Sequence, residues 1–246
     1  MRDSDHSATP LLLLPGLICD ARIWAPQAEA LRALGHDVHA IEGYGESDTF
    51  GAMAELVLRT APDRFALAGH SMGGRVAFEI FRRVPERVER LALISTGVHL
   101  PRSEKEAEGR FELLKRGVEQ GMDALIDAWL PPMVWEPNRL IPGLMDRLTQ
   151  MCADMGIDTY ERQIRALLAR PEVESLLPTI ACPALVATGR HDSWAPPAQH
   201  EGIAAAIPNA RLEIIAEAGH MVPVERPQAV TDALASWLNM PWRAAN

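Results

Sequence analysis

A Gly-x-Ser-x-Gly sequence is the feature that most restricts how this chain can fold. The five residues GHSMG at 69–73 directly follow an apolar run at 65–68 and precede a segment with helical periodicity. A serine can stand clear of such a sharp strand-to-helix turn only where its neighbours lack side chains that would collide. The new helix also directs free N–H groups and its positive end at the turn. The pattern therefore predicts a strand–turn–helix unit that exposes Ser71 as a nucleophile.

Short apolar runs recur along the chain and alternate with helical patterns. Most of these runs are apolar throughout, which is typical of parallel strands buried on both faces. They occupy residues 11–14, 38–41, 65–68, 91–94, 184–188 and 212–215. The alternation predicts an α/β fold with a mostly parallel sheet of about six strands and helices on both faces.

One long segment interrupts this alternation. Residues 98–178 show only helical patterns, which are punctuated by prolines. We expect this segment to form a helical cap, or lid, inserted above the carboxyl edge of the sheet. The α/β core then comprises residues 10–97 and 180–242, and residues 1–9 are expected to be a flexible tail.

A serine hydroxyl needs a base, and the base needs an acid that orients it. His220 lies between the last strand and the last helix, and Asp192 is the only carboxylate in the loop after the fifth strand. Both loops fall at the carboxyl edge of the predicted sheet, as Ser71 does. We therefore predict a Ser71–His220–Asp192 triad. We expect His70 to point away from Ser71 and His200 to lie at the surface.

The remaining parts of a site are less visible in the sequence. Backbone N–H groups of Leu17 and Met72, each just after a predicted strand, could form an oxyanion hole. Apolar side chains that could line a substrate pocket are Trp129, Met133, Trp135, Trp194 and Met221. Because no charged clamp is evident, we expect a small to medium, largely apolar substrate.

With these motifs in this order, the chain resembles the α/β-hydrolase superfamily. The resemblance is to its compact single-domain branch with a helical cap, which includes carboxylesterases, enol-lactone hydrolases and carbon–carbon bond hydrolases. Two features depart from the family pattern. Pro15-Gly16 stands where the family usually has His-Gly, and few residues precede the first strand. The usual opening hairpin therefore does not fit, and we expect six core strands.

The resemblance implies hydrolysis of a carboxylic ester through an acyl-enzyme. The alternatives keep the triad: a lactone or carbon–carbon bond hydrolase, or a pyruvate-eliminating lyase, since residues 69–75 resemble the elbow of the menaquinone-pathway synthase. In those enzymes Arg75, Arg139 or Arg190 could bind a substrate carboxylate. A hydrolase-fold binding protein is a further alternative. An aspartate nucleophile, which some members of the superfamily use, is excluded by Ser71.

Charge and composition limit the classes of partner that the protein is expected to bind. The 246 residues include 24 Lys and Arg against 33 Asp and Glu, a net charge of −9. This balance argues against nucleic acid or an anionic membrane as a partner. No apolar run approaches 18 residues and no signal peptide is evident, so we expect a cytoplasmic protein. Three widely spaced cysteines are expected to be reduced, and no metal or cofactor is expected. The oligomeric state, monomer or homodimer, stays open.

Overall fold

The computed structural model describes residues 9–101 and 104–241. Six strands form one sheet in the order β2-β1-β3-β4-β5-β6, and all five pairings are parallel. The strands are β1 (Leu11–Leu14), β2 (Val38–Ala40), β3 (Phe65–His70), β4 (Val88–Ile94), β5 (Ala184–Gly189) and β6 (Ala210–Ile215). The six-stranded α/β fold predicted from the sequence is therefore confirmed.

The order of the strands marks where a ligand site is expected. The chain runs from β1 outward to β2 and then returns to the other side of β1 as β3. In open parallel sheets, ligands bind beyond the carboxyl ends of the strands at such a reversal of direction. The turns that follow β1 and β3 carry Leu17 and Ser71 respectively.

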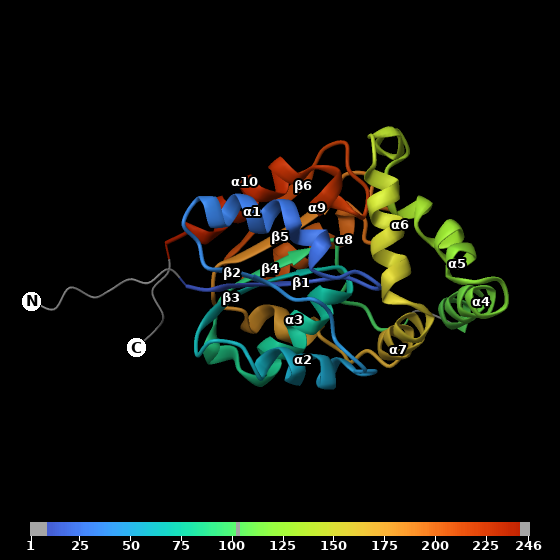
Figure 1. Cartoon of the computed structure of the whole chain (residues 1–246). Coiled ribbons are helices and arrows are strands. Elements are labelled where there is room, and N and C mark those ends of the chain that lie inside the picture. Colours follow the sequence, from blue (N-terminus) through green and yellow to red (C-terminus); the bar gives the residue numbers. More distant parts are fainter. Residues whose placement is uncertain (1–8, 102–103, 242–246) are drawn as a thin grey trace, which may run out of the picture.

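Helices cover both faces of the sheet (Figure 1). Helices α1 (Ala25–Ala33) and α10 (Pro227–Leu238) lie on one face, and α2 (Phe50–Leu58) and α3 (Met72–Arg83) lie on the other. Helix α8 (Pro197–Ala206) packs against β5 and β6. Helix α10 begins with Pro227, which tolerates the first position because no N–H partner is needed there.

The core lies on both sides of the central strands, since every residue of β1, β3 and β5 is buried. Two fully buried indoles lie in this core, and the N–H group of each donates to a backbone carbonyl. Trp24 Nε1 donates to the Leu14 carbonyl at 3.0 Å, and Trp237 Nε1 donates to the Pro183 carbonyl at 3.0 Å. Buried tryptophans of this kind contribute apolar area without leaving an unpaired donor.

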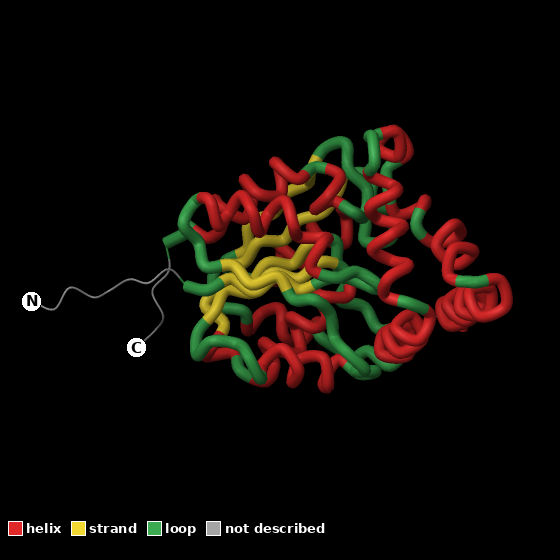
Figure 2. Tube along the Cα trace, in the orientation of Figure 1, coloured by secondary structure: helices red, strands yellow, loops and turns green. Residues whose placement is uncertain are grey.

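Between β4 and β5 the chain forms only helices and loops in its described part (Figure 2). We call residues 98–178 the cap segment. It contains α4 (Glu104–Gln120), α5 (Met122–Trp129), α6 (Leu144–Met155) and α7 (Ile157–Leu168), with short 3-10 turns at Pro131–Met133, Glu136–Leu140 and Glu174–Thr179. These helices lie together beyond one end of the sheet (Figure 1).

The cap segment contacts the core through polar groups as well as apolar ones. Gln163 Oε1 on α7 accepts from Ile18 N at 2.7 Å, and Arg22 pairs with Asp154 at 2.7 Å. The division into a core and a lid, with the boundaries given above, stays a prediction. Of the tail expected at residues 1–9, residues 1–8 lie outside the described part. No helix in the described ranges is both long enough and apolar enough to cross a membrane.

Candidate active site

Ser71 occupies a strained turn between β3 and α3. Its φ is 53° and its ψ is −116°, a conformation that costs about 1–3 kcal/mol for a residue with a side chain. The flanking glycines make the turn possible. A Cβ on Gly69 would lie 2.4 Å from the Gly73 carbonyl oxygen, and one on Gly73 would lie 2.4 Å from the Leu14 carbonyl oxygen. The packing of strand, turn and helix therefore requires glycine on both sides of the serine.

The three residues predicted as a triad are joined by hydrogen bonds. Ser71 Oγ lies 2.8 Å from His220 Nε2, and His220 Nδ1 lies 2.8 Å from Asp192 Oδ2. The Asp192 carboxylate can only accept, so Nδ1 carries the proton and Nε2 is left to accept the serine proton. The structure thus brings together side chains from the ends of β3, β5 and β6.

Asp192 is held as an anion in a nearly closed environment. Its Oδ1 accepts from Trp194 N at 2.9 Å and from Ala195 N at 2.8 Å, and Thr188 Oγ1 donates to Oδ2 at 3.2 Å. Burial alone would raise the pKa of the Asp192 carboxyl, but the His220 ring and the neighbouring donors lower the pKa to about 2. The carboxylate is therefore ionised at neutral pH and can orient the imidazole.

The predicted oxyanion donors lie beside Ser71. Leu17 and Met72 line the same cavity as Ser71, and in the described part of the chain neither backbone N–H has a hydrogen-bond partner. The loop that carries Leu17 is fixed without the histidine usual in the family. Tyr44 Oη donates to the Pro15 carbonyl at 2.9 Å, and Gln163 accepts from Ile18 N. These two side chains hold the Pro-Gly loop in place.

Two buried histidines form hydrogen bonds with the backbone around the site. His70 Nε2 donates to the His220 carbonyl at 2.8 Å, which links the elbow to the loop that carries the base. The expectation that His200 lies at the surface is wrong, because its side chain is fully buried. His200 Nε2 accepts from Thr96 N at 3.1 Å, and Thr96 Oγ1 donates to the Ser71 carbonyl at 2.7 Å. Both rings thus position backbone around the nucleophile.

Glu225 was not among the predicted site residues, yet it fixes the loop of His220. Its carboxylate accepts from Gly219 N at 3.0 Å, from Trp135 N at 3.0 Å and from Asn138 Nδ2 at 2.8 Å. Burial raises the pKa of the Glu225 carboxyl. The sequence signal that could have found it is its place five residues after His220, at the end of the short helix α9 (Val222–Glu225).

A cavity of about 260 Å³ opens beside Ser71. Of the predicted pocket residues, Trp129, Met133 and Trp194 line this cavity, together with Leu167 from the cap segment. The other two predicted residues do not line it. Trp135 stacks on His191 instead, with ring centroids 4.6 Å apart and an interplanar angle of 5°. Met221 is buried in the hydrophobic core.

Ionisable side chains also line this cavity, although no charged clamp was evident in the sequence. They are Arg75, His99, Glu106, Arg110 and Arg170. Of the three arginines considered from the resemblance, Arg75 lines the cavity, whereas Arg139 and Arg190 do not. Within residues 9–101 and 104–241, no cluster of three or more His, Cys, Asp or Glu side chains could hold a metal ion.

A sharp strand-to-helix turn that presents a serine, a Ser–His–Asp hydrogen-bond chain and a parallel sheet covered by helices are features of α/β hydrolases. Residues 11–233 match the model of the Alpha/beta hydrolase family, and the chain belongs to this family.

The comparisons also identify similar proteins with different activities. The chain is 31% identical to "Putative carbamate hydrolase RutD" of Pseudomonas savastanoi, over 95% of each chain. Its fold is similar to an esterase of Thermogutta terrifontis solved with malate bound, with a TM-score of 0.86, 30% identity and coverage of 94% and 90%. An enol-lactonase of Burkholderia xenovorans matches with a TM-score of 0.80, 27% identity and coverage of 96% and 93%.

Proposed function

We propose that this protein is a serine hydrolase that cleaves a carboxylic ester of small to medium size through an acyl-enzyme. The observation that carries the proposal is the hydrogen-bond chain that runs from Ser71 Oγ through the His220 ring to Asp192. Ser71, at one end of this chain, lines the cavity. The strained backbone of Ser71 supports it, because such strain persists where a site needs it.

The proposed reaction proceeds in two halves. Ser71 Oγ attacks the carbonyl carbon while His220 Nε2 takes its proton, and the N–H groups of Leu17 and Met72 stabilise the oxyanion. The tetrahedral intermediate collapses to an ester on Ser71, and His220 gives its proton to the departing alcohol. Water then attacks the acyl-enzyme with His220 again as the base, which releases the acid and restores Ser71.

The relatives are named as hydrolases of different bonds, so their names are compatible with more than one scissile bond in the substrate. Esters, lactones and carbamates all present a carbonyl carbon to the same nucleophile and oxyanion donors. The charged groups of the cavity favour a second candidate, a lactone or carbon–carbon bond hydrolase or an eliminating lyase that acts on a carboxylate-bearing substrate. Such an enzyme would turn over simple neutral esters slowly.

The experiment is intact-mass analysis after reaction with a fluorophosphonate probe, with a nitrophenyl-ester chain-length series run in parallel. Wild type and Ser71→Ala are compared. We expect stoichiometric labelling and ester turnover in wild type, with both lost in the variant. Labelling with slow turnover of all simple esters would move the proposal to the second candidate. Absence of labelling would refute Ser71 as an activated nucleophile.

A further inference from the structure

Four charged side chains in the cavity take no part in the proposed reaction. They are Arg75, Glu106, Arg110 and Arg170, three guanidinium groups and one carboxylate. They come from three separate places in the chain: α3, α4 and the segment after α7. The cavity wall therefore holds more positive than negative charge.

The single carboxylate is already shared by two arginines. Arg170 Nη1 and Nη2 reach the two oxygens of Glu106 at 2.6 and 2.8 Å, and Arg110 Nη2 reaches Oε1 at 3.1 Å. Burial would raise the pKa of Glu106, but the two guanidinium groups lower the pKa to about 2. Glu106 is therefore an anion whose one charge is matched by two cations.

Arg75 forms no direct ion pair in the described part of the chain, although the carboxylates of Glu106, Glu172 and Glu174 attract it from a greater distance. Its side chain donates to the carbonyl oxygens of His99 and Pro171, which carry no net charge, and its residue is only 5% exposed. Burial, and after it repulsion by Arg170, lower the pKa of Arg75 more than these three carboxylates raise it. A buried charge of this kind is stabilised when an anion enters the cavity beside it.

The position of Arg75 relates this charge to the reacting atoms. It lies four residues after Ser71 at the start of α3, a rise of roughly 6 Å along the helix. Long side chains on a helix lean back toward its N-terminus, which here is the end that carries the nucleophile. An anionic group beside Arg75 would thus lie only a few bonds from a carbonyl carbon attacked by Ser71.

We propose that the cavity selects acyl substrates that carry a carboxylate a few bonds from the scissile carbonyl, such as half-esters of short dicarboxylic acids. This inference rests on the proposed function and names its substrate class. A carboxylate suits the site better than a phosphate dianion, because Glu106 keeps one negative charge in the same wall.

The test compares matched pairs of esters that differ in one charge. Monoethyl glutarate and ethyl pentanoate place or omit a carboxylate in the acyl part, and butanoyl glycolate and propyl butanoate do so in the alcohol part. Charge-assisted hydrogen bonds correspond to about a 10- to 100-fold change in affinity. We therefore expect wild type to show at least about a 10-fold higher kcat/KM for the charged member of one pair.

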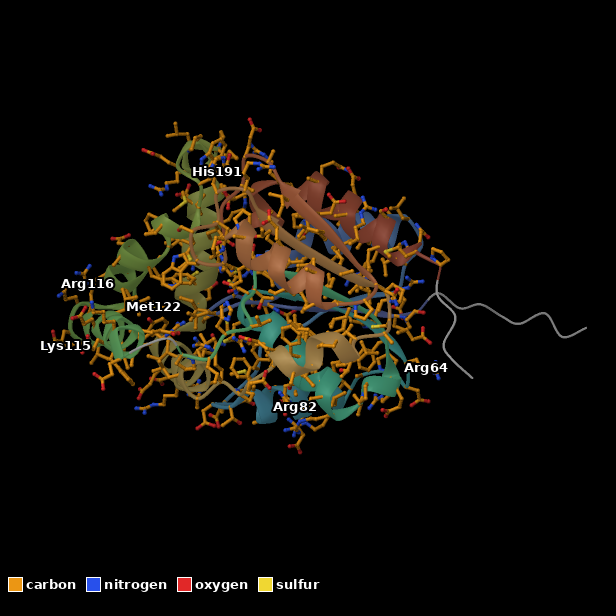
Figure 3. All side chains as sticks on the ribbon, turned by 180° about the vertical axis from the view of Figure 1, so that it is seen from behind. Arg64, Arg82, Lys115, Arg116, Met122 and His191 are labelled. Atoms are coloured by element: carbon orange, nitrogen blue, oxygen red, sulfur yellow. The ribbon has the colours of Figure 1, made fainter. Side chains whose placement is uncertain are left out.

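Variants with opposite expected signs separate binding from a purely structural role. Arg75→Gln and Arg110→Gln should each lower the charged-to-neutral ratio of kcat/KM by about 10-fold. Glu106→Gln, which removes the negative charge from the wall, should raise that ratio. Two matched controls are Arg82→Gln on α3 and Arg116→Gln on α4, which replace exposed cations outside the cavity (Figure 3). Both should leave the charged-to-neutral ratio of kcat/KM unchanged.

The outcomes distinguish this inference from the proposed function. Fluorophosphonate labelling of Ser71 with equal kcat/KM for charged and neutral esters would overturn the inference alone. Equal losses for both members of a pair in Arg110→Gln would also overturn it. If Ser71 is not labelled, calorimetric binding of glutarate to wild type decides the matter. Binding that is lost in Arg110→Gln and not competed by inorganic phosphate supports the carboxylate site, and absence of binding refutes it.

Discussion

Replacing His70 by glutamine tests whether a buried neutral histidine ties the nucleophile turn to the base. His70 is 1% exposed, and its Nε2 donates to the His220 carbonyl at 2.8 Å. Burial and the nearby His220 ring, whose centroid is 5.4 Å away, lower the pKa of His70 to about 3. Glutamine can place an amide donor near the same carbonyl, but it does not titrate.

The sign of the pH effect follows from linkage. Below about pH 6.5 the unfolded chain binds a proton on His70, whereas the folded chain does not until about pH 3. The contribution of His70 to the free energy of unfolding is therefore complete above pH 6.5 and is lost as the pH falls through this window. At about pH 5 the loss amounts to roughly 2 kcal/mol. His200 titrates in both proteins and cancels in the difference.

We expect His70→Gln to be less stable than wild type at about pH 8 by roughly 1 kcal/mol, since one hydrogen bond is made less well. The gap should close or reverse at about pH 5, because only wild type loses the His70 contribution. Urea unfolding followed by circular dichroism at several pH values measures both free energies. Parallel pH dependences in the two proteins would refute this account, as would an NMR titration that shows His70 charging near pH 6.

Three further substitutions test separate parts of the site. Asp192→Asn should lower kcat for ester hydrolysis by on the order of 10⁴-fold because the amide favours the wrong His220 tautomer, with stopped turnover assays as the measurement. Gly73→Ala should lower the free energy of unfolding by about 2–4 kcal/mol, since its Cβ would lie 2.4 Å from the Leu14 carbonyl oxygen; wild-type stability in urea would contradict this. Glu225→Gln should cost about 2 kcal/mol in the same assay, because the new amide would face backbone donors.

The triad residues that the sequence predicted all follow strands of the sheet. Ser71, Asp192 and His220 each follow an apolar run, and parallel strands bring their carboxyl ends to one edge. Once the runs are recognised, the approximate positions of the loops follow without knowledge of side-chain packing. Leu17 and Met72 were predicted for the same reason, since they also follow strands.

The residues that the sequence analysis missed depend on how helices pack. Arg110 and Arg170 both bind Glu106, although they lie 60 residues apart in the chain. No local pattern predicts which faces of α4 and α7 meet. His200 stands between Gln199 and Glu201 in α8, where no strong apolar stripe marks the buried face. Trp135 precedes a short proline-containing turn, so its direction was not fixed by helical periodicity.

The bonds around Met133 limit how the cap segment can move relative to the base. The Met133 carbonyl accepts from His220 N at 2.8 Å and from Met221 N at 3.2 Å, and the adjoining Trp135 N donates to Glu225. The loop that carries the base is therefore held from the cap side as well as from the sheet. A displacement of residues 133–138 would therefore disturb the position of His220. Met133 also lines the cavity, so one short segment of backbone contributes to the cavity wall and to the placement of the base.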